Sequence, residues 1–147
     1  MTATVLKELT VSGRSGATVF DQAYRSGAVQ VIDGHDHPCG VEPAWASRLD
    51  EGERDTLLAF EKIRAAFIII DDRRGVQCCN SRKVPHINAL LCPRTLYAAG
   101  LISQERCRQA VDQLIVIGRY SSFVIEYARQ CAFDRLRAFE PAVKFIH

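Results

Sequence analysis

The spacing of apolar side chains along the chain predicts helices and short strands in alternation through its first half. Val19, Phe20, Ala23 and Tyr24, for example, recur at the intervals of one face of an amphipathic helix. The same kind of pattern, often with capping residues, predicts helices over residues 2–10, 17–25, 49–63, 94–99, 103–117 and 121–132, and a helix or turn over 73–81. Short apolar runs predict strands over residues 28–32, 66–70 and 84–88. Residues 33–47, which carry several Gly and Pro, are expected to form a loop.

The alternation of helix and strand favours parallel strands joined by crossover helices, and the second half is mostly helical. We therefore expect a small α/β sandwich with helices added at the C-terminal end. The continuous apolar run at 66–70 is typical of a strand that is buried on both faces. We expect one α/β domain over residues 1–102 and a helical extension over 103–147 that packs on it.

The composition narrows the class of protein. With 147 residues, 48% hydrophobic and 24% charged, the chain is globular rather than disordered, collagen-like or a coiled-coil rod. The net charge of +2 argues against binding nucleic acid by bulk charge, although 15 of the 19 basic residues are Arg, which can grip phosphates. The start has no secretory leader pattern and no apolar run reaches membrane-spanning length. With six Cys among mostly apolar neighbours, we expect a reduced, cytoplasmic protein with no membrane partner.

Asp71 and Asp72 follow the apolar run 66–70 directly. Ligands of parallel sheets bind at the carboxyl ends of the strands, so these two carboxylates could hold a divalent cation there. Arg73 and Arg74 come next and are candidates for contacting a substrate phosphate. The simpler interpretation is that Asp72 caps the following helix and that Asp71 pairs with an arginine.

Two further acids stand near helix starts. Glu53 follows Asp50 by three residues, which is the spacing of a capping box, and this alone explains both side chains. Glu8 lies in the first expected helix, where a single Glu ordinarily faces solvent.

Five segments of the chain resemble PIN-domain proteins, and most of all a PIN-related bacterial branch linked to toxin–antitoxin systems. They are Leu-Asp-Glu-Gly-Glu at 49–53, followed by Thr-Leu-Leu-Ala at 56–59, Phe-Ile-Ile-Ile-Asp-Asp-Arg-Arg-Gly at 67–75, Thr-Val-Leu-Lys-Glu-Leu at 4–9 and Ala-Ala-Gly-Leu-Ile at 98–102. The resemblance covers about residues 3 to 102.

The resemblance implies a three-layer α/β/α sandwich with a short parallel sheet, and a cluster of carboxylates that binds Mg²⁺ or Mn²⁺. In such a protein, a water bound to the metal attacks an RNA phosphodiester. Glu8, Glu53 and Asp72 match three of the family's acids, and Asp71 stands beside them. The corresponding function is a divalent-metal-dependent endoribonuclease of toxin type, with RNA and a small antitoxin-like protein as partners and a homodimer as one expected assembly.

The chain departs from the family pattern at its start. The family begins with a strand that ends in an Asp ligand, and only Met1, Thr2 and Ala3 precede the helix with Glu8. Either the given reading frame starts too late, or the chain is a degenerate member that folds without this strand. The second alternative predicts weak or absent nuclease activity and leaves the strand at 28–32 to pair with 66–70 or with a partner chain. The alternative function is a non-catalytic interaction protein on the same fold.

A second kind of metal site has to be considered. The run His-Asp-His-Pro-Cys at 35–39 places imidazole and thiolate groups close together, as Zn²⁺ prefers. The residues that would form this zinc-binding module are His35, His37 and Cys39, with Cys78, Cys79 and His86 to complete it. The chain has no Cys-x-x-Cys pair, and a plain surface loop explains the run equally well.

Overall fold

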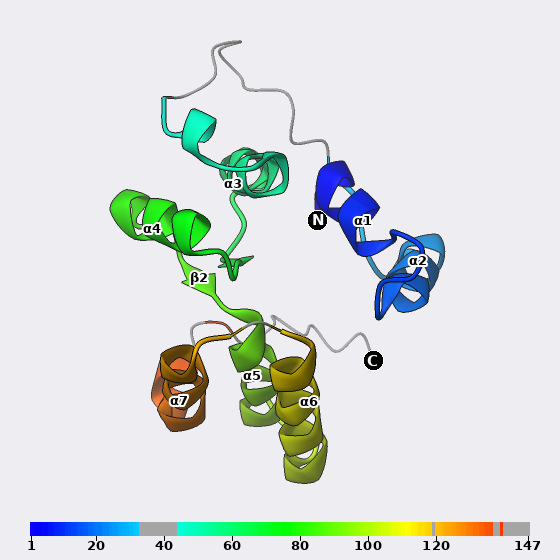
Figure 1. The fold of residues 1–147 in the computed structure, drawn as a ribbon, viewed down its shortest axis with the longest axis vertical. Helices are drawn as coiled ribbons and strands as arrows, with labels where there is room; N and C mark the ends of the chain where they lie inside the picture. The colour runs from blue at the N-terminus through cyan, green and yellow to red at the C-terminus, as the bar shows by residue number, and fades with distance from the viewer. Residues whose placement is uncertain (33–43, 119, 137–138, 140–147) are drawn as a thin grey trace. The chain divides into compact units, whose positions relative to one another are not determined.

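The computed structural model describes residues 1–32, 44–118, 120–136 and 139. The chain forms two compact units (Figure 1). The first unit comprises residues 1–68 and 72–84, and the second comprises residues 69–71 and 85 onward. The proposed zinc ligands His35, His37 and Cys39 lie outside the described residues.

The described part of the first unit contains four α-helices and a 3₁₀ turn: α1 (Ala3–Leu9), α2 (Ala17–Arg25), η1 (Ala46–Arg48), α3 (Glu51–Ile63) and α4 (Arg73–Arg82). These helices confirm the elements predicted from apolar spacing. Thr2 caps α1 through its side chain, and Asp50 and Glu53 form the capping box that opens α3. Local signals therefore place these helix starts.

Helix α3 contributes more buried apolar side chains to the first unit than any other described element. Leu57, Leu58 and Ala59 are buried on it, and Cys79 of α4 is fully buried. Helix α1 packs against α3 and against α2. A polar contact accompanies this packing, because the Thr4 hydroxyl donates to Asp55 Oδ2 at 2.5 Å and Asp55 is only 1% exposed.

The strand predicted over residues 28–32 is wrong as a regular strand. Ile32 forms a single parallel bridge with Thr2, and its amide donates to the Met1 carbonyl at 2.9 Å. The expected pairing of 28–32 with 66–70 is not seen among the described residues. The segment forms only the isolated bridge with Thr2 among the described residues. A regular strand needs a ladder of hydrogen bonds to a neighbouring strand, and one bridge does not supply it.

The described residues contain one small sheet, in which β1 (Ile68–Ile69) and β2 (His86–Ile87) run parallel. The Ile70 amide donates to the Ile87 carbonyl at 3.0 Å and extends this pairing. Ile68 and Ile70 are buried, but Ile69 between them is 56% exposed. The prediction of burial on both faces is therefore wrong, and the segment has the alternating pattern of a strand covered on one side.

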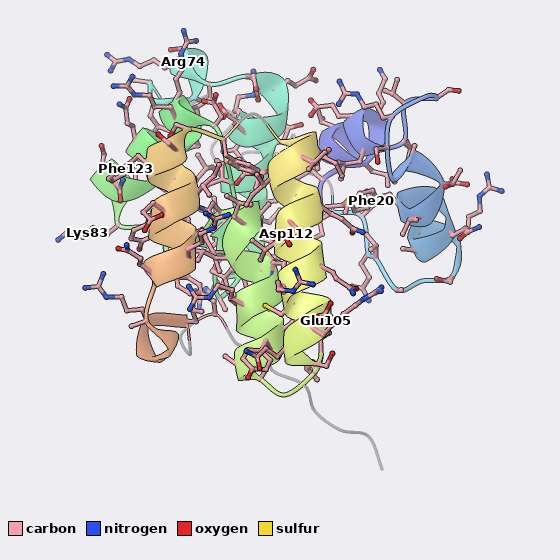
Figure 2. All side chains as sticks on the ribbon, turned by 60° about the horizontal axis from the view of Figure 1, so that its bottom comes forward. Phe20, Arg74, Lys83, Glu105, Asp112 and Phe123 are labelled. Carbon is pink, nitrogen blue, oxygen red and sulfur yellow. The ribbon has the colours of Figure 1, made fainter. Side chains whose placement is uncertain are left out.

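The second unit continues with η2 (Ala89–Leu91), α5 (Cys92–Ala98), α6 (Gln104–Ile117), α7 (Ser122–Gln130) and α8 (Phe133–Leu136). The Ser103 side chain caps α6, and of the two neighbouring candidates Ser121 and Ser122 it is Ser121 that caps α7. Helix α5 packs against α6, and the two lie side by side in Figures 1 and 2. Arg94 of α5 donates to the last carbonyls of α7, those of Ala128 and Arg129.

The chain is thus a mostly helical α/β protein with a two-stranded parallel sheet in its described part. Within that part, no helix has both the length and the apolar character needed to cross a membrane. The five cysteines in the described ranges are free thiols. The division between 1–102 and 103–147 stays a prediction.

Candidate functional site

Glu53 is held at the start of α3 by the capping box. Its amide donates to Asp50 Oδ1 at 2.8 Å, and its Oε2 accepts from the Asp50 amide at 3.4 Å. The capping role predicted from spacing is therefore confirmed for both side chains. It engages only one of the two carboxylate oxygens of Glu53.

The other oxygen, Glu53 Oε1, is buried and has no hydrogen-bond partner among the described residues. The side chain of Asp72 lies within hydrogen-bonding reach of Glu53. Two ionised carboxylates are both acceptors, so this contact becomes a hydrogen bond only when one of them is protonated. Burial, then the charge of Asp50, then Asp72 raise the pKa of Glu53 from 4.5 to about 7.

Asp72 caps α4, as the simpler sequence interpretation predicts. Its Oδ1 accepts from the Arg74 amide at 2.7 Å. Hydrogen bonds from the amide of Arg74 and, less strongly, those of Gly75 and Arg73 hold the pKa of Asp72 below its ordinary value. The proton of the pair therefore resides on Glu53, and Asp72 keeps its negative charge.

Glu8 approaches the same region from α1. It is exposed, and its carboxylate lies against Gly52, the residue before Glu53. A Cβ at residue 52 would stand 3.0 Å from Glu8 Oε1, which is tighter than an ordinary contact. The absence of a side chain at Gly52 thus lets Glu8 come close to the start of α3.

Asp71 belongs to the second unit and has different partners. Its Oδ1 accepts from the Ala89 amide at 2.8 Å, and its Oδ2 accepts from the Tyr120 hydroxyl at 2.9 Å. The simpler sequence interpretation predicted that Asp71 pairs with an arginine, and this prediction is wrong, because the partners are Ala89 and Tyr120. Burial and the bond to Asp71 raise the pKa of Tyr120 above its ordinary value. Sequence reasoning missed Tyr120, because no local pattern links residues 49 positions apart.

The donor set can be compared with the needs of a cation. Among the described residues, no three His, Cys, Asp or Glu side chains form a ready-made metal cluster. Glu53 and Asp72 nevertheless fit Mg²⁺ or Mn²⁺, which accept one or two protein carboxylates and complete their shell with water and substrate phosphate. The buried, unpartnered Glu53 Oε1 is the oxygen that such a cation would satisfy. Cys78, Cys79 and His86 form no cluster within the described ranges that would favour zinc.

The arginines named from the sequence are exposed. Arg73 and Arg74 both lie in the first turn of α4, and Figure 2 shows the Arg74 side chain projecting away from the ribbon. In the described structure, neither guanidinium makes an ion pair with a carboxylate. They remain available to an anion beside Asp72.

The described structure defines a helix-rich α/β protein with a two-stranded parallel sheet and, in its first unit, an interacting pair of acids at two helix starts. A family model described as a PIN domain matches residues 1–130, and the chain belongs to this family. The match extends past residue 102, where sequence reasoning ends the resemblance, to the end of α7. No curated protein and no solved structure gives a significant match.

Proposed function

We propose that the chain is a ribonuclease of toxin type that requires Mg²⁺ or Mn²⁺, with Glu53 and Asp72 as the carboxylates that hold the cation. The observation that carries this proposal is the close acid pair with one buried oxygen that lacks a partner. Membership of the PIN-domain family supports it. With it we propose the three-layer α/β/α sandwich of that family, in keeping with the parallel pairing of β1 and β2.

Each acid has a distinct part in this proposal. Asp72 stays ionised and offers its carboxylate first, whereas Glu53 releases its proton when the cation binds. Glu8, beside Gly52, adds negative charge at the edge of the pair. Asp71 is a positioning residue, since its two oxygens tie the end of β1 to Ala89 and Tyr120.

The bound cation supplies charge stabilisation to the phosphodiester and activation of a water. Arg73 and Arg74 face the same helix start as Asp72 and contact the flanking phosphate. The two arginines stand next to the two carboxylates of Glu53 and Asp72. Their positive charge offsets the repulsion between these carboxylates and the negatively charged phosphate of the substrate.

The test is cleavage of a labelled single-stranded RNA by protein stripped of metal, with Mn²⁺ or Mg²⁺ added back. We expect cleavage that depends on the cation and falls to background in Asp72→Asn and Glu53→Gln. Asp112→Asn is the matched control, because among the described residues Asp112 of α6 pairs with Arg108 on its own helix surface and with no residue of the site. No cleavage by the wild type at high protein concentration, or undiminished cleavage by Asp72→Asn, would sink the proposal.

A second candidate function is a non-catalytic interaction protein, and one observation favours it. Three apolar side chains of the second unit are strongly exposed: Val116 at 85%, Ile117 at 62% and Phe123 at 79%. Large exposed apolar side chains mark a protein interface where they adjoin one another. Under this candidate, we propose that a small antitoxin-like protein or a second copy of the chain covers them. The molar masses of the wild type and of Phe123→Ser in solution test the homodimer. If both equal the mass of one chain, the homodimer is ruled out.

A further inference from the structure

A cavity of about 580 Å³ lies in the first unit, next to the acid pair. Among the described residues, η1 and the chain around it contribute one side of the lining and α4 contributes the other. The lining consists of Trp45, Arg48, Leu49, Arg74, Gln77, Cys78, Ser81 and Arg82. The volume falls within the range of sites that hold a small ligand or one unit of a polymer.

The cavity is suited to an anion. Three of its lining side chains are guanidinium groups, and none of the described lining residues is acidic. Arg82 forms an ion pair with Glu61, but in the described structure Arg48 and Arg74 make no ion pair. Guanidinium groups without a carboxylate partner favour phosphate, which they can contact through two parallel hydrogen bonds.

The cavity also contains a flat aromatic wall. Trp45 is half-buried, and the Arg82 guanidinium lies 4.5 Å from the centre of its ring. Glu61 pairs with Arg82 in turn and so keeps the guanidinium beside the indole. An indole beside guanidinium groups is the combination on which single-stranded nucleic acids bind, with a base on the ring and the backbone on the charges.

The cavity adjoins the acid pair through its own residues. The Arg74 amide donates to Asp72, and Leu49 directly precedes Asp50 of the capping box. The charge of Glu53 also reaches Cys78, whose pKa is raised mainly by burial and further by Glu53. A strand of nucleic acid at Asp72 would therefore have its neighbouring nucleotide at this cavity.

We propose that the cavity between η1 and α4 is a subsite for one nucleotide of a single-stranded nucleic acid, with the base against Trp45 and the phosphates on Arg48 and Arg74. This inference rests on the proposed function in one respect, since the position of the cavity next to the cleaved phosphate assumes that cleavage takes place at Asp72. Binding of a nucleotide in the cavity does not itself require cleavage. It names a specificity element for single strands that the acid pair alone does not supply.

Trp45 is the only tryptophan of the chain, so its fluorescence reports on this cavity alone. The probe is a nuclease-resistant 2′-O-methyl octaribonucleotide, added to the full chain in EDTA. We expect saturable quenching of Trp45 by the octamer. A duplex of the same sequence should quench much less, because its bases are already stacked. A matched oligodeoxyribonucleotide shows whether the 2′-oxygen matters. No quenching by either single strand would overturn the proposal.

Variants test the two halves of the subsite, with binding followed by anisotropy of a labelled octamer. Trp45→Ala should weaken binding about 5- to 150-fold, as expected for the loss of one stacked base. Arg48→Ala with Arg74→Ala should flatten the salt dependence, so that the wild type loses about sevenfold more affinity than the double variant between roughly 50 and 200 mM salt. Both arginines are exposed, so these substitutions leave the fold intact.

Arg106→Ala is the matched control, since Arg106 is an exposed arginine of α6 whose side chain lies outside this cavity. Equal losses of octamer affinity in Arg106→Ala and in the double variant would overturn the proposal. Quenching of Trp45 fluorescence by an oligoglutamate peptide, with none by the octamer, would also overturn it. Because the assay contains EDTA, failure here is separable from failure of the proposed function. Cation-dependent cleavage with no quenching would refute the subsite alone, and quenching without cleavage would refute the nuclease alone.

Discussion

The carboxyl group of Asp72, which caps α4, lies within hydrogen-bonding reach of Glu53 in the first turn of α3. The two environments differ. Amide groups of the first turn of α4 stabilise the charge of Asp72, whereas burial and two neighbouring carboxylates oppose the charge of Glu53. The pair therefore holds one proton more tightly than two isolated acids would.

The first prediction concerns the pH dependence of stability without metal. The pKa of Glu53 is raised from 4.5 to about 7 on folding, so its stabilising contribution is fully present below about pH 4.5 and is lost as pH rises through about 7. We expect the wild type in EDTA to become less stable between roughly pH 5 and 8, with Glu53→Gln less affected. Asp72 has a lowered pKa and changes its contribution only at more acidic pH.

Thermal unfolding at a series of pH values measures this slope. Mn²⁺ should restore stability at the alkaline end in the wild type but not in Glu53→Gln, because a ligand that binds only the folded state stabilises it. Identical pH slopes for the two proteins would show that Glu53 is not the group responsible.

Helix starts could be predicted from the sequence because their signals are local. Asp50 with Glu53, Ser103 and Ser121 each act within one turn of their own helix, and the structure places all of them as caps. Strand pairing is not local. The apolar run 28–32 looks like a strand by composition, but in the described chain it forms one bridge to Thr2, with hydrogen bonds to the backbone of Met1.

The candidate site shows the same limit. The motifs named Glu53 and Asp72, but nothing in the spacing predicted that they face each other or that Glu53 keeps an oxygen without a partner. Tyr120 and Asp55 were missed for the same reason, since their partners lie 49 and 51 residues away. One signal was available for Asp55, which stands three residues after Gly52 and four before Ala59 on the buried face of α3.

A second prediction separates the two roles of Asp72. Asn caps helices about as well as Asp, so Asp72→Asn should change the free energy of unfolding by less than about 0.5 kcal/mol, whereas Asp72→Ala should cost about 1 kcal/mol. Both variants should lose the stabilisation by Mn²⁺. Urea unfolding with and without the cation measures both effects. Retained Mn²⁺ stabilisation in Asp72→Asn would show that its carboxylate is not a ligand.

A third prediction concerns the contact between Asp71 and Tyr120. Tyr120→Phe removes one hydrogen bond and should cost about 0.5–1.5 kcal/mol of unfolding free energy. Asp71→Ala removes the bond to the Ala89 amide as well and should cost more. In a double-mutant cycle, the coupling of the two residues should account for most of the Tyr120→Phe effect. Additive losses would mean that the hydroxyl acts through some other neighbour.

The last prediction concerns the attachment of α1, which carries Glu8, to α3. The Thr4 hydroxyl donates to Asp55 Oδ2, and Asp55 is 1% exposed. Thr4→Val keeps the shape and branching of the side chain but removes this donor from a buried carboxylate, which should cost about 1–3 kcal/mol. Thr10→Val is the matched control, because in the described structure the Thr10 hydroxyl bonds to carbonyls of its own helix alone, and its loss should cost about 0.5 kcal/mol or less. Urea unfolding compares the two variants, and hydrogen exchange locates the change. Faster exchange in α1 of Thr4→Val alone is expected, because the bond ties this helix to α3. Equal costs for the two variants would show that the buried contact with Asp55 does not hold α1 in place.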